Sequence, residues 1–352
     1  MQTAPPPTAQ YSVHDGDPGR HRDVVLGLWQ GNLGVPERMA AKYEWFYQQC
    51  PFGPPMLRFL HQGAANPPIG TCSAGMRRML WRGNEIRAGV LVDLAVVPEH
   101  RSLGPALILQ QGMIDSARQR LDLLYGFPNA KAVPVFKRIG YRKLADMVRY
   151  TRVVRHAAYL GRWMPTALAR ILGPGVDLAL RLRDGLRNLG SGRLDAGWSS
   201  RADARMDELW QRSGHGQALT AIRSREYAQW RFDAAPGGGT RYLLLSARGS
   251  KALAAWFATQ SRGGTLHVLD FWSVDAATAI PRHYLDALLG AARASGHAAV
   301  SVEMATSSER LQPWLDRGFS PRESRPVMGC WSDPENASAE PDLHLTAADE
   351  DE

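Results

Sequence analysis

The sequence predicts an α/β protein with two similar halves, and three observations support this prediction. The chain has 352 residues, about twice the length of an ordinary domain. Strand-like apolar runs alternate with helix-like segments, which indicates a sheet covered by helices. A pattern of aromatic, proline and glycine residues recurs in the second half. The hydrophobic fraction of 44% and the charged fraction of 22% exclude wholesale disorder.

The recurring pattern has two constant offsets. At an offset of 185 residues, the matched pairs are Trp45 with Trp230, Tyr47 with Phe232, Pro51 with Pro236 and Gly53 with Gly238. At an offset of 178 residues, they are Phe136 with Trp314, Gly140 with Gly318 and Tyr141 with Phe319. We interpret the chain as a divergent tandem repeat.

The predicted elements follow the same order in each half. In the first half they are an aromatic-rich helix before the Pro/Gly turn at 51–55, strands over 57–60 and 89–97, a helix over 106–120 and a buried strand over 121–127. In the second half they are strands over 242–246, 252–259 and 267–272, a helix over 281–295 and a strand over 298–304. Between the halves, helical spacing of Leu178, Leu182, Leu186 and Leu189 predicts a helix.

These elements divide the chain into five predicted segments. They are a disordered N-terminus (1–21), a first domain (22–150), a basic helical linker (151–205), a second domain (206–331) and an acidic disordered tail (332–352). The tail holds eight acidic residues and no Lys or Arg, so the formal net charge of +8 leaves +16 on the remainder. Eleven arginines and four aspartates lie between Arg149 and Arg205, which makes the linker strongly basic.

The positive charge suits an anionic ligand, a membrane surface or nucleic acid, and charge alone does not choose among them. We interpret the linker either as an amphipathic helix on anionic lipid or as a solvated helix between two domains. No nucleic-acid-binding module is recognisable, so nucleic acid is not an expected partner. Three cysteines without C-x-x-C spacing, no N-terminal targeting pattern and no apolar run of about 18 residues predict a cytoplasmic protein. The ten histidines have no paired spacing, so no metal site is predicted.

The most informative segment runs from Val90 to Ala106, where a strand ends at Pro98 and a tight loop leads into a helix. Such a turn directs successive backbone N–H groups at one point, and the helix behind it adds partial positive charge. The loop is therefore either an anion cradle or an ordinary strand-to-helix turn in which Gly104 adopts a special backbone angle.

This loop, Arg101 to Ala106, resembles the R/Q-x-x-G-x-G/A loop of the GCN5-related N-acetyltransferase (GNAT) superfamily. Downstream, Asn129, Ala132, Phe136, Gly140 and Tyr141 resemble its N-x-x-A-x-x-x-Y-x-x-x-G-F element. The resemblance covers roughly residues 24–331. The chain also resembles bacterial proteins that have two GNAT domains in tandem. The resemblance implies two tandem GNAT-like domains, each with a mixed, mostly antiparallel sheet flanked by helices.

The resemblance also implies that the first half binds acetyl-CoA or another acyl-CoA and transfers the acyl group, expected to be acetyl, to an amine. The implied cofactor-binding residues are Leu94, Ala95 and Val96 for the pantetheine arm, Arg101, Ser102, Leu103, Gly104 and Ala106 for the pyrophosphate, and Asn129. In this chemistry the amine attacks the thioester directly, so the protein needs a base and an acid but no covalent nucleophile.

Asp93 is the candidate base, and its alternative role is that of a structural strand-end carboxylate. Phe136 stands where many GNAT enzymes have a tyrosine that protonates the leaving sulfur, so Tyr125 or a water would have to supply that proton. Pro105 removes one N–H from the cradle, which weakens phosphate binding without abolishing it.

The second half has no comparable loop between Ser273 and Pro281, and Ser307 replaces the asparagine. This half is predicted to shape the acceptor cleft instead. Arg231, Asp270 and Glu303 are interpreted either as acceptor contacts or as structural ion-pair partners.

Two other functions are compatible with the sequence. One is a catalytically silent GNAT-like module that binds acyl-CoA or organises partners. The other is a FemABX-like transferase that uses aminoacyl-tRNA. The predicted acceptor is an amine on a small molecule or on a surface-polymer precursor, with a weak contact to anionic membranes through the linker.

Overall fold

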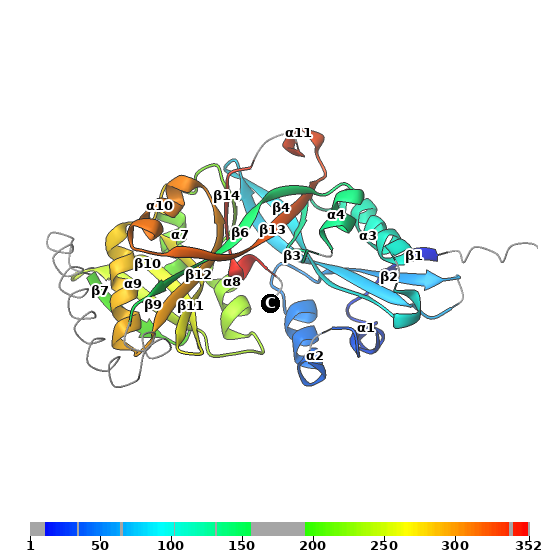
Figure 1. The fold of residues 1–352 in the computed structure, drawn as a ribbon, viewed down its shortest axis with the longest axis horizontal. Helices are drawn as coiled ribbons and strands as arrows, with labels where there is room; N and C mark the ends of the chain where they lie inside the picture. The colour runs from blue at the N-terminus through cyan, green and yellow to red at the C-terminus, as the bar shows by residue number, and fades with distance from the viewer. Residues whose placement is uncertain are drawn as a thin grey trace, which may run out of the picture.

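One mixed sheet of 14 strands connects the two halves of the protein (Figure 1). The structure is a computed structural model, and it describes residues 11–33, 35–63, 66–101, 103–130, 132–155, 194–337 and 341–350. The sheet with its flanking helices confirms the predicted α/β class.

The first half contains β1 (Tyr11–Gly16), α1 (Arg22–Trp29), α2 (Pro36–Tyr43), η1 (Glu44–Gln48), β2 (Met56–Gln62), β3 (Gly70–Trp81), β4 (Asn84–Val96), η2 (Pro98–His100), α3 (Leu103–Ala117), β5 (Leu123–Gly126), α4 (Val133–Arg138) and β6 (Arg142–Val153). The second half contains β7 (Leu194–Ser199), α7 (Arg205–Arg212), β8 (Leu219–Ala221), α8 (Arg225–Ala228), η3 (Gln229–Asp233), β9 (Arg241–Ala247), β10 (Leu253–Arg262), β11 (Thr265–Ser273), α9 (Arg282–Ala294), β12 (Ala299–Thr306), α10 (Ser308–Asp316), β13 (Ser320–Trp331), α11 (Pro334–Ala337), β14 (Leu343–Thr346) and η4 (Ala347–Asp349). The predicted ranges that fall on described residues each overlap one of these elements, but no range was predicted for the strands β1, β3, β6, β7, β8, β13 and β14. The predicted helix between the halves lies outside the described residues.

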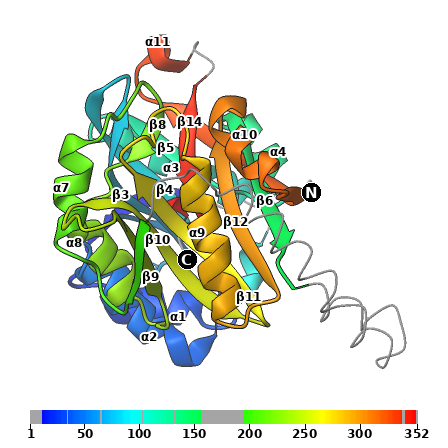
Figure 2. The same cartoon turned by 90° about the vertical axis from the view of Figure 1, so that its left-hand side faces the viewer.

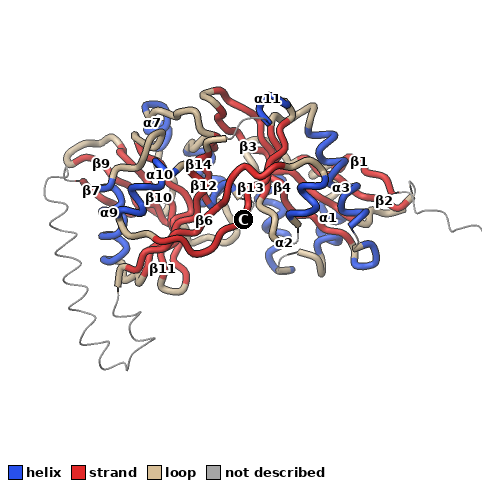
Figure 3. Tube along the Cα trace, turned by 45° about the horizontal axis from the view of Figure 1, so that its top comes forward, coloured by secondary structure: helices blue, strands red, loops and turns tan. Residues whose placement is uncertain are grey.

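The strand order is β1-β2-β3-β4-β5-β13-β6-β12-β11-β10-β9-β7, and it shows that the halves exchange their long last strands. β13 of the second half pairs with β5, β6 of the first half pairs with β12, and β6 and β13 pair with each other. Figure 3 shows these strands running through the middle of the molecule. Because each half completes the sheet of the other, neither can keep its sheet intact alone.

Three apolar clusters hold the layers together. One lies under α3 and α4 on one face of the first half, and a second lies under α9 in the second half, where α9 crosses the sheet (Figure 2). The third joins α1, α2 and η1 to α8, η3 and β14, and so connects the two halves.

Two tryptophans that match at the 185-residue offset meet in this third cluster. The Nε1 of Trp45 donates to the carbonyl of Trp230 at 2.6 Å, and the Nε1 of Trp230 donates to the carbonyl of Trp45 at 3.0 Å. Their rings stack with centroids 5.3 Å apart, while Arg77 lies over Trp230 and Arg231 over Trp45. Both residues sit in short π-helical turns, η1 and η3, which turn the indoles toward each other.

The prediction of a disordered acidic tail over 332–352 is wrong for the residues that the structure describes. β14 and η4 are ordered elements whose apolar residues, Leu343, Leu345 and Ala348, are buried. The tail's acids form ion pairs with arginines, as in Arg310–Asp342, Arg223–Asp349 and Arg325–Glu350. The tail is ordered because arginines of the second half neutralise its acidic charge, and composition alone does not reveal these partners.

Two other segment predictions need correction. Disorder over 1–21 is wrong from Tyr11 onward, because β1 pairs with β2 along its whole length. Of the predicted helical linker, residues 156–193 lie outside the described residues, and the following stretch forms the strand β7, which pairs with β9. Among the helices that the structure describes, none has the length and apolar character needed to cross a membrane.

We expect the tail to contribute substantially to stability. Leu345 is fully buried in β14, so Leu345→Ala should lower the free energy of unfolding by about 2–5 kcal/mol. The matched control is Leu315→Ala on α10, where the side chain is exposed and the change should stay within about 0.5 kcal/mol. Urea unfolding of both variants measures the difference, and equal effects would contradict a packed tail.

Candidate functional site

The candidate site lies where β4 and β5 part. They pair in parallel only at Ala88–Leu123, Gly89–Leu124 and Val90–Tyr125. β4 then continues to Val96 and pairs there only with β3, while β5 ends at Gly126. The edge of β4 beyond Val90 therefore borders a gap that no described strand fills.

A bulge in β4 lies beside this gap. The register with β3 shifts between Thr71 and Ser73, and Asp93 has φ +55°, in the left-handed region. Leu91 and Leu94 pack under α3, and simple alternation from Leu91 would put Asp93 on that same face. The bulge instead turns Asp93 to the α2 and η1 side, where its carboxylate is buried.

Asp93 is held by a buried network on that side. Its Oδ1 lies 2.7 Å from Lys42 Nζ of α2, and its Oδ2 accepts from the Tyr47 hydroxyl at 3.0 Å. The Tyr47 oxygen is also 2.8 Å from Ser73 Oγ. Burial raises the pKa of Tyr47 well above its usual value, so its hydroxyl stays protonated. Both oxygens of the predicted base therefore already have partners.

The predicted cradle leads from η2 into the first turn of α3, which begins at Leu103. Gly104 is helical rather than left-handed, so the alternative interpretation based on a special backbone angle is wrong. A Cβ built on Gly104 would meet no atom within 4 Å, which leaves free space over the start of the helix. Ala106 is half-buried on α3, and Ser102 lies outside the described residues.

The side chain of Arg101 caps the strand that precedes the cradle. Its Nε donates to the Val96 carbonyl at 3.1 Å, and its guanidinium also bonds Asn32 of the loop after α1. The three predicted arm-binding residues lie on β4 at the gap, with Ala95 and Val96 buried and Leu94 half-buried.

Two predicted residues lie on β5 and in the loop that follows it. The Oδ1 of the exposed Asn129 accepts from the Ala132 amide at 3.1 Å, at the turn into α4. Tyr125 is fully buried, and its hydroxyl donates to the Asp349 carbonyl in the tail at 2.9 Å. Burial raises the pKa of Tyr125 far above its ordinary value. Because this hydroxyl already serves a carbonyl and is a weak acid, the geometry opposes the predicted role of Tyr125 as proton donor.

The corresponding place in the second half is filled by the chain itself. β11 and β12 pair in parallel from Thr265–Ala299 to Val268–Val302, and β14 then lies antiparallel to β12 from Met304 to Thr306. The Thr346 hydroxyl of β14 donates to Asp270 Oδ1 at 2.8 Å. The tail residues that fill this gap carry no motif that sequence reasoning could have recognised.

The polar residues considered as acceptor contacts all serve this architecture. Asp270 pairs with Arg223 at 2.9 Å, with both side chains fully buried. Glu303 bridges Arg149 and Arg325, and the Nε of Arg231 donates to the Ala348 carbonyl at 2.9 Å. The second interpretation of these three residues, as structural partners, therefore fits the structure. Ser307, which stands in place of the asparagine, caps α10 by accepting from the Arg310 amide.

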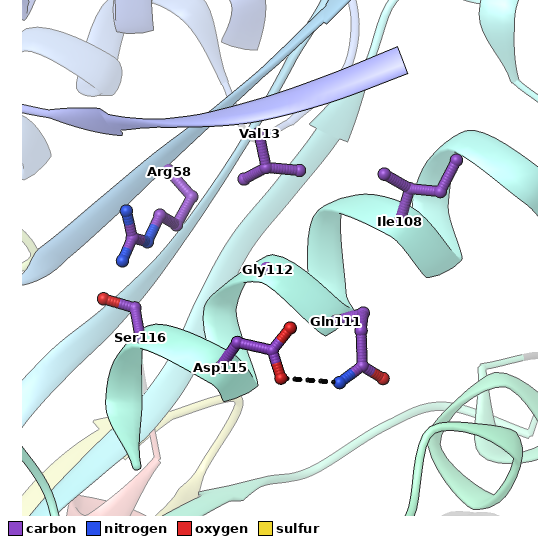
Figure 4. Close-up of a pocket in the computed structure, with 7 residues that line it drawn as sticks. All are labelled: Val13, Arg58, Ile108, Gln111, Gly112, Asp115 and Ser116. Carbon is purple, nitrogen blue, oxygen red and sulfur yellow. Dashed lines mark hydrogen bonds between the residues drawn. The ribbon is translucent and has the colours of Figure 1, made fainter. Parts of the chain in front are cut away.

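A separate hollow of about 520 Å³ lies on the other flank of α3 (Figure 4). It is lined by Val13, Arg58, Ile108, Gln111, Gly112, Asp115 and Ser116. Arg58 is paired with Asp15 of β1, and none of the predicted site residues lines this hollow. It is therefore distinct from the gap between β4 and β5.

No protein-family model matches the chain, and no curated protein matches it. Solved structures do match. A conserved protein of unknown function from Enterococcus faecalis V583, described as a probable N-acyltransferase, superposes with a TM-score of 0.65 at 12% identity, covering 92% of this chain and 73% of its own.

Two further matches are GCN5-related N-acetyltransferases. The one from Kribbella flavida has a TM-score of 0.60 at 14% identity and covers 92% of this chain and 71% of its own. The one from Anabaena variabilis ATCC 29413 has a TM-score of 0.60 at 11% identity and covers 92% and 74%. The protein therefore has the GCN5-related N-acetyltransferase fold, as the resemblance of its loop motifs indicated.

The buried Asp270 predicts a pH-dependent stability. Burial, reinforced by repulsion from Asp349 and opposed by Arg223, raises its pKa to about 6. The unfolded chain loses this proton near pH 4. The group therefore stabilises the fold fully below about pH 4, and that contribution is lost as the pH rises through about 6.

The measurement compares urea unfolding of the wild type and Asp270→Asn between pH 4 and pH 7. The stability advantage of the wild type over the variant should shrink as the pH rises. A difference that stays constant over this range would contradict the raised pKa of Asp270.

Proposed function

We propose that this protein is an acyl-CoA-dependent N-acyltransferase whose first half holds the acyl-CoA. One observation carries the proposal. In the second half, β14 fills the place where β11 and β12 part, whereas in the first half the edge of β4 beyond Val90 borders a gap beside the start of α3. The GCN5-related N-acetyltransferase fold supports the same reaction class.

The residues around the gap fit the two polar parts of an acyl-CoA. The free edge of β4 offers backbone groups of Leu94 and Ala95 to an extended, amide-containing arm, as another strand would. The first turn of α3 offers backbone N–H groups and the positive end of the helix to a diphosphate. The free space over Gly104 lets a phosphate approach this turn closely.

The reaction needs an amine at the thioester carbonyl. The nitrogen lone pair forms the new C–N bond, the C–S bond breaks, the sulfur leaves as the thiol of CoA and the nitrogen gives up a proton. We retain Asp93 as the proposed base, because it lies on the part of β4 beyond Val90 whose edge borders the gap. We do not retain Tyr125 as the acid, since its hydroxyl is bound to Asp349.

A second candidate function is a module that binds acyl-CoA without turnover. Two facts favour this binding module: Phe136 has no proton to give, and the Tyr125 hydroxyl is already hydrogen-bonded to the Asp349 carbonyl. Thiol release from acetyl-CoA across a panel of amines separates the two functions, because a silent module binds the ligand and releases no thiol.

The acceptor and the location are part of the proposal. We propose an amine on a small molecule or on a surface-polymer precursor as acceptor, and the cytoplasm as the compartment. The linker segment that would touch an anionic membrane lies outside the described residues. If the protein releases no thiol from acetyl-CoA but transfers an aminoacyl group from aminoacyl-tRNA, it is a FemABX-like transferase instead.

Gly104→Glu tests the cradle. The added carboxylate would occupy the free space and repel a diphosphate, so acetyl-CoA affinity should fall by about 10-fold or more. Glutamate near a helix N-terminus favours the helix, so the melting temperature should not fall.

The matched control is Gly290→Glu in α9, where a Cβ also meets nothing within 4 Å. It should leave acetyl-CoA affinity unchanged in isothermal titration. The proposed function is wrong if the wild type shows no affinity for acetyl-CoA in the millimolar range.

Asp93→Asn tests the base. If Asp93 takes the proton from the amine, kcat should fall by about 100-fold or more while KM for acetyl-CoA changes little. Lys42→Met is the control, because it breaks the same ion pair and leaves the carboxylate in place. Equal losses of kcat in both variants would assign Asp93 a structural role alone.

A further inference from the structure

The hollow of Figure 4 contains a charged side chain in an otherwise apolar layer. Side chains of β2 alternate between the two faces of the sheet, so Met56, Arg58 and Leu60 share the face beneath α3. Met56 and Leu60 belong to the apolar cluster under that helix. Arg58 lies between them, is only 8% exposed and lines the hollow. A charge in such a place is costly unless a partner balances it.

Asp15 balances this charge only in part. It lies opposite Arg58 in the register of β1 and β2 and forms an ion pair with it. The Asp15 side chain is 68% exposed, however, and an ion pair with a solvated carboxylate contributes little. Among the described residues, the buried Nε of Arg58 has no hydrogen-bond partner. Burial, together with repulsion from Arg120, lowers the pKa of Arg58, so a further anion beside its guanidinium would be stabilising.

The helix α3 supplies the opposite wall of the hollow. Its lining residues recur every three or four positions and so form one stripe along the helix: Ile108, Gln111, Gly112, Asp115 and Ser116. The stripe has an apolar end at Ile108, which is 38% exposed, and a polar end at Ser116. Figure 4 shows the Arg58 guanidinium at the Ser116 end. The two ends are about 12 Å apart along the helix axis, so one ligand can have a charged end and an apolar end here.

The charges around the hollow favour a ligand with a single negative charge. Asp115 already has partners, since its carboxylate accepts from Gln111 Nε2 at 2.9 Å and lies 3.8 Å from Arg118. Asp15 and Asp115 would both repel a doubly charged phosphate more strongly than a carboxylate. The planar guanidinium of Arg58 matches the two oxygens of a carboxylate. The volume of about 520 Å³ is in the range of sites that bind small molecules.

We propose that this hollow binds a small aliphatic carboxylate. The Arg58 guanidinium donates to the carboxylate oxygens, the Ser116 hydroxyl donates to the same group, and the aliphatic chain lies between Val13 and Ile108. The bound carboxylate gives Arg58 an anionic partner that is shielded from water, which the exposed Asp15 does not provide. The site lies on the flank of α3 away from the gap, so the inference does not rest on the proposed function.

The test uses three ligands in isothermal titration: octanoate, 1-octanol and acetate. Octanoate has both the charge and the chain, 1-octanol has the chain without the charge, and acetate has the charge without the chain. The wild type should bind octanoate at least about 10-fold more tightly than 1-octanol, because the alcohol loses the ionic hydrogen bonds to Arg58. It should also bind octanoate at least about 10-fold more tightly than acetate, because acetate buries no chain.

Arg58→Met removes the charge and keeps an apolar side chain in the layer. It should weaken octanoate binding by about 10-fold and leave 1-octanol binding within about 2-fold. Its melting temperature should not fall, because an apolar side chain replaces a buried charge and the Asp15 left behind is exposed.

Two further variants make the test specific. Ser116→Glu leaves Arg58 in place and adds a fixed carboxylate at the same end of the hollow, so it should also weaken octanoate binding by about 10-fold. Arg87→Met is the matched control, because it removes the same charge from a side chain on β4 that is 64% exposed and does not line the hollow. It should bind octanoate as the wild type does.

Three results would overturn the inference. They are no octanoate binding by the wild type in the millimolar range, equal affinities for octanoate and 1-octanol, and equal losses of octanoate affinity in Arg58→Met and Arg87→Met. If Arg58→Met does not fold, Ser116→Glu decides between the outcomes. The proposed function is tested separately by acetyl-CoA binding, so a protein that binds acetyl-CoA and not octanoate would contradict this inference alone.

Discussion

Parallel pairing stops early in both halves, after Val90–Tyr125 in one and after Val268–Val302 in the other. Each stop leaves two strands that diverge, and diverging strands expose backbone groups that need partners. In the second half β14 supplies them. In the first half no described strand does so, and the start of α3 lies beside the free edge. The difference between the halves thus comes from where the tail folds, since the underlying sheets follow the same plan.

A buried carboxylate accompanies the divergence in each half. Asp93 and Asp270 both lie at bulges and both pair with a cation, Lys42 or Arg223. The second half has Asp270 even though β14 fills its gap. An ion pair that holds the bulge in place therefore accounts for both Asp93 and Asp270 without a catalytic role. A catalytic role for Asp93 would be an addition to this architectural one, and the comparison with a Lys42 variant separates the two.

The tail also links the second half, whose gap β14 fills, to the first half, whose gap no described strand fills. Its backbone carbonyls accept from Tyr125 and Arg77 of the first half and from Arg231 of the second. The two arginines cover the outer faces of the Trp45–Trp230 stack. Tyr125 is the last β5 residue paired with β4, so the tail contacts one of the two strands that border the gap. The exchange of β6 and β13 adds backbone hydrogen bonds between the two halves.

The sequence by itself determined the α/β class, most strands and helices, the loop before α3 and the resemblance between the halves. These are local properties: the periodicity of apolar residues, the positions of glycine and proline, and spacing within one segment. The tertiary structure alone decided that the last strands exchange, that the acidic tail is ordered and that Tyr125 serves the tail. Each of these depends on a partner far away in the chain. Lys42 finds Asp93 51 residues on, and Tyr125 finds Asp349 across 224 residues, so no pattern within one segment could have revealed either pairing.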